Sequence, residues 1–123
     1  MSDTTDIFQI ETLRQQFKRR GSLVISFTVQ FETICTVPKK PYGGDILITY
    51  APSFDKEGYA TLLEWNSFAR WVETLRSQMY LAEELAQLVA DTVMIKVAPE
   101  CVDVVVKVKS PFHLPVEIEV TIP

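Results

Sequence analysis

A long alternation of apolar and polar residues constrains the fold of this chain more than any other feature. The apolar positions are Leu23, Ile25, Phe27, Val29, Phe31 and Cys35. The polar positions between them are Ser26, Thr28, Gln30 and Glu32. Successive side chains of a β-strand point to opposite faces, so a period of two predicts a long strand over residues 21–37 with one buried face. Cys35 lies at the end of that buried face.

Three further segments show the strand pattern. Residues 45–51 (DILITYA) follow a connection over 38–44 that contains two prolines and two glycines, so they form a hairpin with the first strand. Val102, Val104, Val106 and Val108 lie opposite in phase to Asp103, Lys107 and Lys109. Val116, Ile118, Val120 and Ile122 alternate with Glu117, Glu119 and Thr121. These two segments predict a second hairpin.

Between the hairpins the apolar period changes to that of an amphipathic helix. Residues 61–76 place Trp65, Phe68, Trp71, Val72 and Leu75 on one stripe. Residues 79–97 repeat the pattern with Leu81, Leu85, Leu88, Val89, Thr92 and Ile95. Pro99 ends this second helix, since proline cannot continue the hydrogen-bond ladder.

The element order is therefore β-β-α-α-β-β, an α+β fold with an antiparallel sheet and two helices on one face. The 123 residues suffice for one domain, which we assign to 21–123, with an N-terminal arm over 1–20. Long strands with free edges tend to pair with other chains. We therefore expect a homo-oligomer in which subunits join edge to edge into a barrel.

Composition excludes several functional classes. A net charge of −4 does not favour broad binding to a nucleic-acid backbone. No apolar run approaches the roughly 18–20 residues of a membrane span. The lone His113 and the two separated cysteines, Cys35 and Cys101, predict no metal site. Two thiols without a signal-peptide pattern indicate the reducing cytoplasm.

Two stretches carry a family resemblance. They are ETICTVPKKPYGGDILITYAPS (32–53) and FARWVETLRSQMYLAEELAQLVADTV (68–93). Both resemble the tunnelling-fold family, and most of all 7-cyano-7-deazaguanine reductase (QueF) and the QueF-like archaeosine amidinotransferases. The helix of those amidinotransferases contains Leu-His-Glu-Glu-Leu-Ala, and residues 81–86 read LAEELA. The resemblance implies a multi-subunit barrel that binds purines or pterins between subunits.

The resemblance also implies roles for particular residues. Cys35 falls on the family's nucleophilic cysteine, which attacks a nitrile and forms a thioimide. Glu83 falls on the glutamate that binds the amidine edge of a guanine-like ring. Glu64 retains the glutamate of a family motif and is a second substrate-binding candidate. Each has a structural alternative: Cys35 as a small buried residue, Glu83 as a solvated helix start and Glu64 as a helix-start carboxylate. Glu84 is interpreted as structural.

The sequence departs from the family at several positions. Ala82 stands where the family has a histidine and Tyr42 where it has an aspartate, and both of those family residues move protons. Asn66 and Ala69 stand where lysines would hold NADPH, so we predict no cofactor. By sequence, the residues near enough to activate Cys35 are Asp45, Tyr42, Lys39 and Lys40.

The leading interpretation is an enzyme that acts on the nitrile of a 7-deazaguanine. The ligand would be free or part of tRNA, and the chemistry amidinotransferase-like or reductase-like, in queuosine or archaeosine tRNA modification. One alternative is a non-catalytic tunnelling-fold paralogue with a base-binding or structural role. Another is an enzyme of pterin chemistry on the same scaffold.

Overall fold

Four antiparallel strands form the main sheet of the computed structural model, which describes residues 7–17, 23–110 and 114–123. Their order in the sheet is β2-β3-β5-β6. The strands are β2 (Ile25–Ile34), β3 (Pro41–Ala51), β5 (Cys101–Val108) and β6 (Val116–Ile122). Both predicted hairpins are present, with β2 paired to β3 and β5 paired to β6. The α+β prediction is therefore confirmed.

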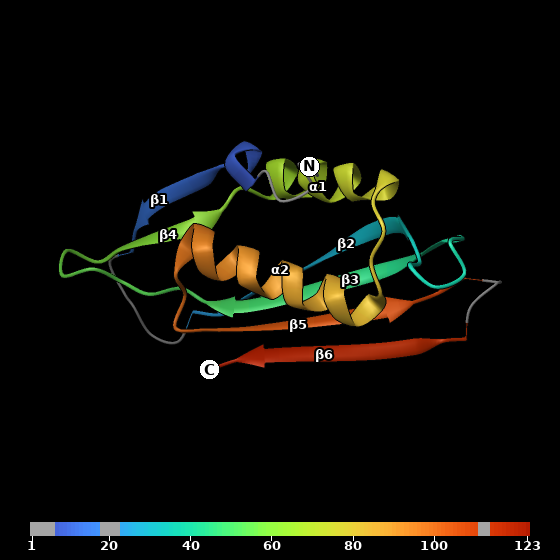
Figure 1. The fold of residues 1–123 in the computed structure, drawn as a ribbon. Helices are drawn as coiled ribbons and strands as arrows, with labels where there is room; N and C mark the ends of the chain where they lie inside the picture. The colour runs from blue at the N-terminus through green and yellow to red at the C-terminus, as the bar shows by residue number, and fades with distance from the viewer. Residues whose placement is uncertain (1–6, 18–22, 111–113) are drawn as a thin grey trace.

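The strand register aligns the alternating apolar residues on one face. Phe27 lies opposite Ile48, and Ile48 lies opposite Val104 on the next strand. Ile48 and Val104 are fully buried. Helices α1 (Trp65–Glu73) and α2 (Ala82–Val97) both lie on this face (Figure 1). The other face carries the polar positions, and none of the helices among the described residues covers it.

The two helices bury somewhat different stripes from those predicted. In α1, Phe68 and Trp71 are fully buried, but Trp65 is 61% exposed. Trp65 is the first helical residue, and helical side chains lean toward the N-terminus, so it lies beyond the core. In α2, Ile95 is 69% exposed, whereas Ala86 and Ala90 are fully buried. Small side chains let α2 lie close to β5 and β6, and they widen its buried face.

A second sheet of two strands was not predicted. Strand β1 (Thr12–Gln16) pairs antiparallel with β4 (Tyr59–Leu63). A short 3-10 helix, η1 (Ile7–Gln9), precedes β1 and contacts α1. The prediction of helix from residue 61 was therefore wrong for 61–63. Neither strand has a strong alternating pattern, so local sequence does not reveal a pairing between segments this far apart. The rest of the predicted arm, 1–6 and 18–20, lies outside the described residues.

The connection between β2 and β3 spans 35–40 and not the predicted 38–44, because β2 ends at Ile34, before the predicted 37, and β3 begins at Pro41. The amide of Cys35 donates to the carbonyl of Lys40 at 2.9 Å, and that of Lys39 to the carbonyl of Cys35 at 2.9 Å. Gly43 and Gly44 lie within the strand. A Cβ on Gly43 would lie 2.6 Å from the carbonyl oxygen of Phe31, so this glycine serves close strand packing rather than a turn.

Candidate functional site

Cys35 follows β2 directly, at the end of the strand predicted to carry it. Its side chain is 7% exposed and belongs to the hydrophobic core, on the face that the helices cover. Both its amide and its carbonyl are hydrogen-bonded within the turn to β3. The backbone of Cys35 is therefore held at one end of the sheet.

The start of α2 is attached to this end of β2. The amide of Ile34 donates to the carbonyl of Gln78 at 3.0 Å, and the amide of Tyr80 donates to the carbonyl of Ile34 at 2.9 Å. The buried hydroxyl of Thr33 donates to the same Gln78 carbonyl at 2.7 Å. A short parallel bridge between Ile34 and Met79 results. These bonds bring the first turn of α2 next to Cys35, although the two segments are distant in sequence.

The two adjacent glutamates at the start of α2 differ in their surroundings. The carboxylate of Glu84 accepts a hydrogen bond from the amide of Leu81 at 2.8 Å, so it satisfies a donor at the helix start. Glu83 is exposed, and its carboxylate makes no hydrogen bond or ion pair with any residue that the structure describes. Glu84 therefore stabilises the helix, and Glu83 is the carboxylate that a ligand can reach.

Tyr42 connects Cys35 with the start of α2. Its side chain is 4% exposed, and its hydroxyl donates to the carbonyl of Tyr80 at 2.8 Å. Its ring packs edge-on against Phe31, with centroids 5.8 Å apart. Burial, and then the charges of Cys35, Glu83 and Glu84, raise the pKa of Tyr42 far above its ordinary value. The phenol therefore stays neutral and cannot serve as a base for the thiol.

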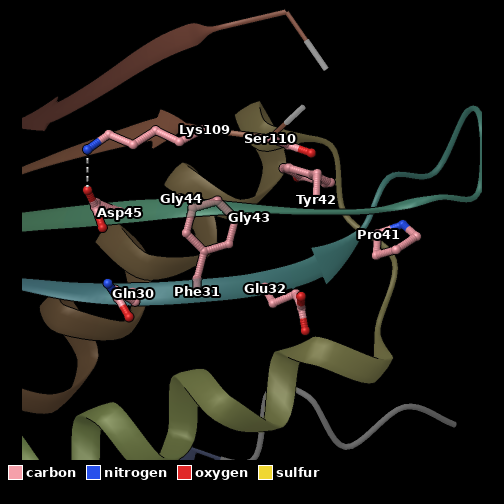
Figure 2. Close-up of a pocket in the computed structure, with 10 residues that line it drawn as sticks. All are labelled: Gln30, Phe31, Glu32, Pro41, Tyr42, Gly43, Gly44, Asp45, Lys109 and Ser110. Carbon is pink, nitrogen blue, oxygen red and sulfur yellow. Dashed lines mark hydrogen bonds and ion pairs between the residues drawn. The ribbon is translucent and has the colours of Figure 1, made fainter. Parts of the chain in front are cut away.

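Asp45, which the sequence suggested as an activator of Cys35, lies on the opposite face of the sheet. Its carboxylate pairs with the ammonium of Lys109 at 2.7 Å (Figure 2). The pair borders an open hollow of about 530 Å³, to which Gln30, Glu32 and Gly43 also contribute. Neither Cys35 nor Glu83 lines this hollow. We place the candidate site at the end of the helix-covered face, because the backbone that leads into α2 is bonded to Ile34 there and both Cys35 and Glu83 act on Tyr42.

Glu64 is not brought to Cys35 and Glu83. It caps the N-terminus of α1, where its carboxylate accepts from the amides of Asn66 and Ser67 at 2.9 Å each. These bonds, with Asn66 the larger contributor, lower the pKa of Glu64 below its ordinary value. Glu64 lies near Ile25, at the opposite end of β2 from Cys35, which corresponds to about 30 Å of strand.

The residue in place of the family histidine and the arrangement of possible metal ligands bear on the chemistry of the site. Ala82, which stands in place of the family histidine, is the first residue of α2 and is buried. Within residues 7–17, 23–110 and 114–123 there is no group of three or more histidine, cysteine or acidic side chains that could hold a metal. None of the helices there is long and apolar enough to cross a bilayer.

The sheet with two helices on one face, a cysteine after its first strand and a glutamate at the start of the second helix define a tunnelling-fold subunit. No protein-family model and no curated protein matches the sequence. Among solved structures, the chain is similar to the apo crystal structure of the archaeosine synthase QueF-Like. The identity is 26%, the TM-score is 0.63, and the match covers 80% of this chain and 90% of that one. This similarity supports the assignment of the chain to a QueF-like tunnelling fold.

Proposed function

We propose that this protein binds a 7-deazaguanine that carries a nitrile and adds the thiol of Cys35 to the nitrile carbon. The observation that carries the proposal is the convergence of Cys35 and Glu83 at one end of the sheet, through the attachment of Gln78 and Tyr80 to Ile34. The similarity to an archaeosine synthase supports this choice of ligand class.

The roles follow from the chemistry of each side chain. The carboxylate of Glu83 accepts two hydrogen bonds from the ring N–H and the exocyclic amino group of the base. The sulfur of Cys35 forms a bond to the nitrile carbon, one carbon–nitrogen π bond opens, and the nitrogen takes a proton, which gives a thioimide. Ammonia or another amine then adds to the same carbon and expels the thiol, so the product is an amidine.

Two further elements belong to the proposal. Asn66 and Ala69 replace the lysines that would hold NADPH, so the reaction ends in amine addition rather than reduction. The protein acts as a homo-oligomer in the cytoplasm, on a base that is free or part of tRNA in queuosine or archaeosine modification. Subunit pairing at the free edges of β2 and β6 would close the barrel.

Mass spectrometry of the intact protein tests the nucleophile. Incubation with 7-cyano-7-deazaguanine should add the whole mass of the ligand, because the thiol proton and sulfur add across the nitrile and nothing leaves. Cys35→Ala should abolish the adduct. Cys101→Ser is the matched control, because Cys101 is an exposed free thiol at the opposite end of the sheet. An adduct that survives in Cys35→Ala would refute the assignment.

Calorimetry with the same ligand tests the carboxylate. Glu83→Gln should weaken binding by about ten-fold or more, since the amide can no longer accept both hydrogen bonds from the base. Asp91→Asn removes an exposed carboxylate from the same helix and should leave binding unchanged. Equal affinity for Glu83→Gln and the unmodified protein would rule out an anchoring role for Glu83.

The buried, neutral Tyr42 and the buried Ala82 favour a second candidate function, because neither supplies a base to Cys35. In that case the protein binds the base without chemistry. Binding by calorimetry without any mass adduct would support this non-catalytic paralogue. Absence of both would leave a pterin ligand as the next compound to test.

A further inference from the structure

Tyr42 lies where β2, β3 and the segment leading into α2 meet. We infer that Tyr42 is a positioning residue that sets the distance between Cys35 and Glu83 through its hydrogen bond to the carbonyl of Tyr80. The expected effect on ligand binding rests on the proposed function. The hydrogen bonds from which the position of α2 is inferred do not depend on the ligand.

The peptide groups of Tyr80 are held from two strands. Its amide donates to Ile34 of β2 at 2.9 Å, and its carbonyl accepts from the phenol of Tyr42 of β3 at 2.8 Å. The next amide, that of Leu81, is bound by Glu84 at 2.8 Å, and α2 begins at Ala82. Because α2 begins at Ala82 and helical geometry sets the rise and rotation of each residue, the position of residues 80 and 81 determines where Glu83 lies.

The surroundings of Tyr42 do not favour a role for its phenol as a proton acceptor. The phenol proton is already donated to Tyr80, and nearby carboxylates oppose ionisation of the hydroxyl. Tyr42 therefore acts on the site through the position of α2 and not by accepting a proton. An ionised carboxylate at this position would have no proton to donate to the Tyr80 carbonyl, so this attachment depends on the phenol of Tyr42.

The test compares Tyr42→Phe with Tyr50→Phe. Tyr50 is a second buried tyrosine of β3, and its hydroxyl accepts from the amide of Leu63 at 3.0 Å, at the end of β3 away from Cys35. Tyr42→Phe should weaken binding of 7-cyano-7-deazaguanine by about ten-fold, the loss typical of one hydrogen bond. Tyr50→Phe should lower stability without a change in affinity. Equal affinity for Tyr42→Phe and the unmodified protein would overturn the inference.

A double-mutant cycle separates positioning from general damage. If Tyr42 acts through Glu83, Tyr42→Phe should cause little further loss in a Glu83→Gln background. If the losses of binding free energy in Tyr42→Phe and Glu83→Gln add in the double variant, the inference is contradicted. Thr33→Val offers a second variant, because it removes the hydroxyl bond to Gln78 from the other strand, and it should cause a smaller loss of affinity.

Hydrogen exchange provides a readout that needs no ligand. The Tyr80 amide should exchange faster in Tyr42→Phe than in the unmodified protein, while exchange in Tyr50→Phe stays unchanged at this amide. Unchanged exchange in Tyr42→Phe would overturn the attachment itself. If the unmodified protein binds no 7-deazaguanine, the proposed function fails, and the exchange result decides whether Tyr42 positions α2.

Discussion

At the scale of single residues, the two buried tyrosines of β3 use their hydroxyl groups in opposite ways. Tyr42 donates to a carbonyl, whereas Tyr50 accepts from the amide of Leu63. Burial raises the pKa of Tyr50, and the bond from Leu63 opposes that rise. One tyrosine thereby attaches the start of α2 to the main sheet, and the other attaches β4, so single hydroxyl groups hold separate parts of the fold together.

Tyr50→Phe is expected to lower the free energy of unfolding by about 1–3 kcal/mol, because the buried amide of Leu63 loses its acceptor. Urea denaturation followed by fluorescence measures the change. Tyr59→Phe serves as the control, since Tyr59 is only half-buried and packs its ring against Arg14. A loss for Tyr50→Phe no larger than for Tyr59→Phe would contradict the assignment.

Glu119 gives a pH-dependent prediction. The hydrogen bond to Asp103 and its charge, with a smaller effect of Glu117, raise the pKa of Glu119. The protonated form is therefore favoured in the folded protein, and this contribution to stability is lost as the pH rises through the raised pKa. Glu119→Gln should raise Tm slightly near neutral pH, and the gain should vanish in acid.

Thermal unfolding over a pH series measures this effect. Glu57→Gln, an exposed carboxylate in a loop, should show no such pH dependence of its Tm difference. A Glu119→Gln variant that is less stable than the unmodified protein at neutral pH would show that the carboxylate pair does not repel.

At the scale of elements, the two helices begin with different capping arrangements. Helix α1 is capped by the side chain of Glu64, the residue that precedes it. Helix α2 uses Glu84 inside its first turn and leaves Glu83 to face outward. Glu64 and Glu83, the two substrate-binding candidates from the sequence, are therefore distinguished by their hydrogen bonds.

Glu64→Ala should lower Tm by a few degrees at neutral pH, because the amides of Asn66 and Ser67 lose their acceptor. The lowered pKa of Glu64 means that its contribution is present above the unfolded pKa and is lost as the pH falls through the folded pKa. The Tm difference should thus disappear in acid. Calorimetric scans at several pH values measure this Tm difference, with Glu100→Ala as an exposed control. A Tm difference for Glu64→Ala that does not change with pH would contradict the capping role.

At the scale of the whole molecule, both outer strands of the main sheet have a free edge among the described residues. The inward side chains of β6 remain half-buried, as do Ile25, Phe27 and Val29 of β2. The isolated chain therefore leaves apolar surface at both edges. Light scattering should give a mass that is a multiple of one chain, and a mass equal to one chain at micromolar concentration would contradict the barrel.

The sequence predicted the main sheet and both helices because each is encoded by local periodicity. Cys35 at the end of β2 followed from the same alternation. The β1–β4 sheet was missed because its pairing depends on distant residues. The meeting of Cys35, Tyr42 and Glu83 was also not derivable from spacing, since it results from the backbone bonds of Gln78 and Tyr80 to Ile34. Tyr42 was noted as a departure from the family pattern and as a possible activator of Cys35, but not as a residue that holds the start of α2.

The bridge between Ile34 and Met79 has a consequence for assembly. The amide and carbonyl of Ile34 already form hydrogen bonds with Gln78 and Tyr80. The accessible edge of β2 therefore ends just before this residue. If another copy of the chain pairs along β2, its strand would meet an obstacle at this residue. A slip of the register toward Ile34, which by one residue would turn every side chain to the wrong face, would then be blocked.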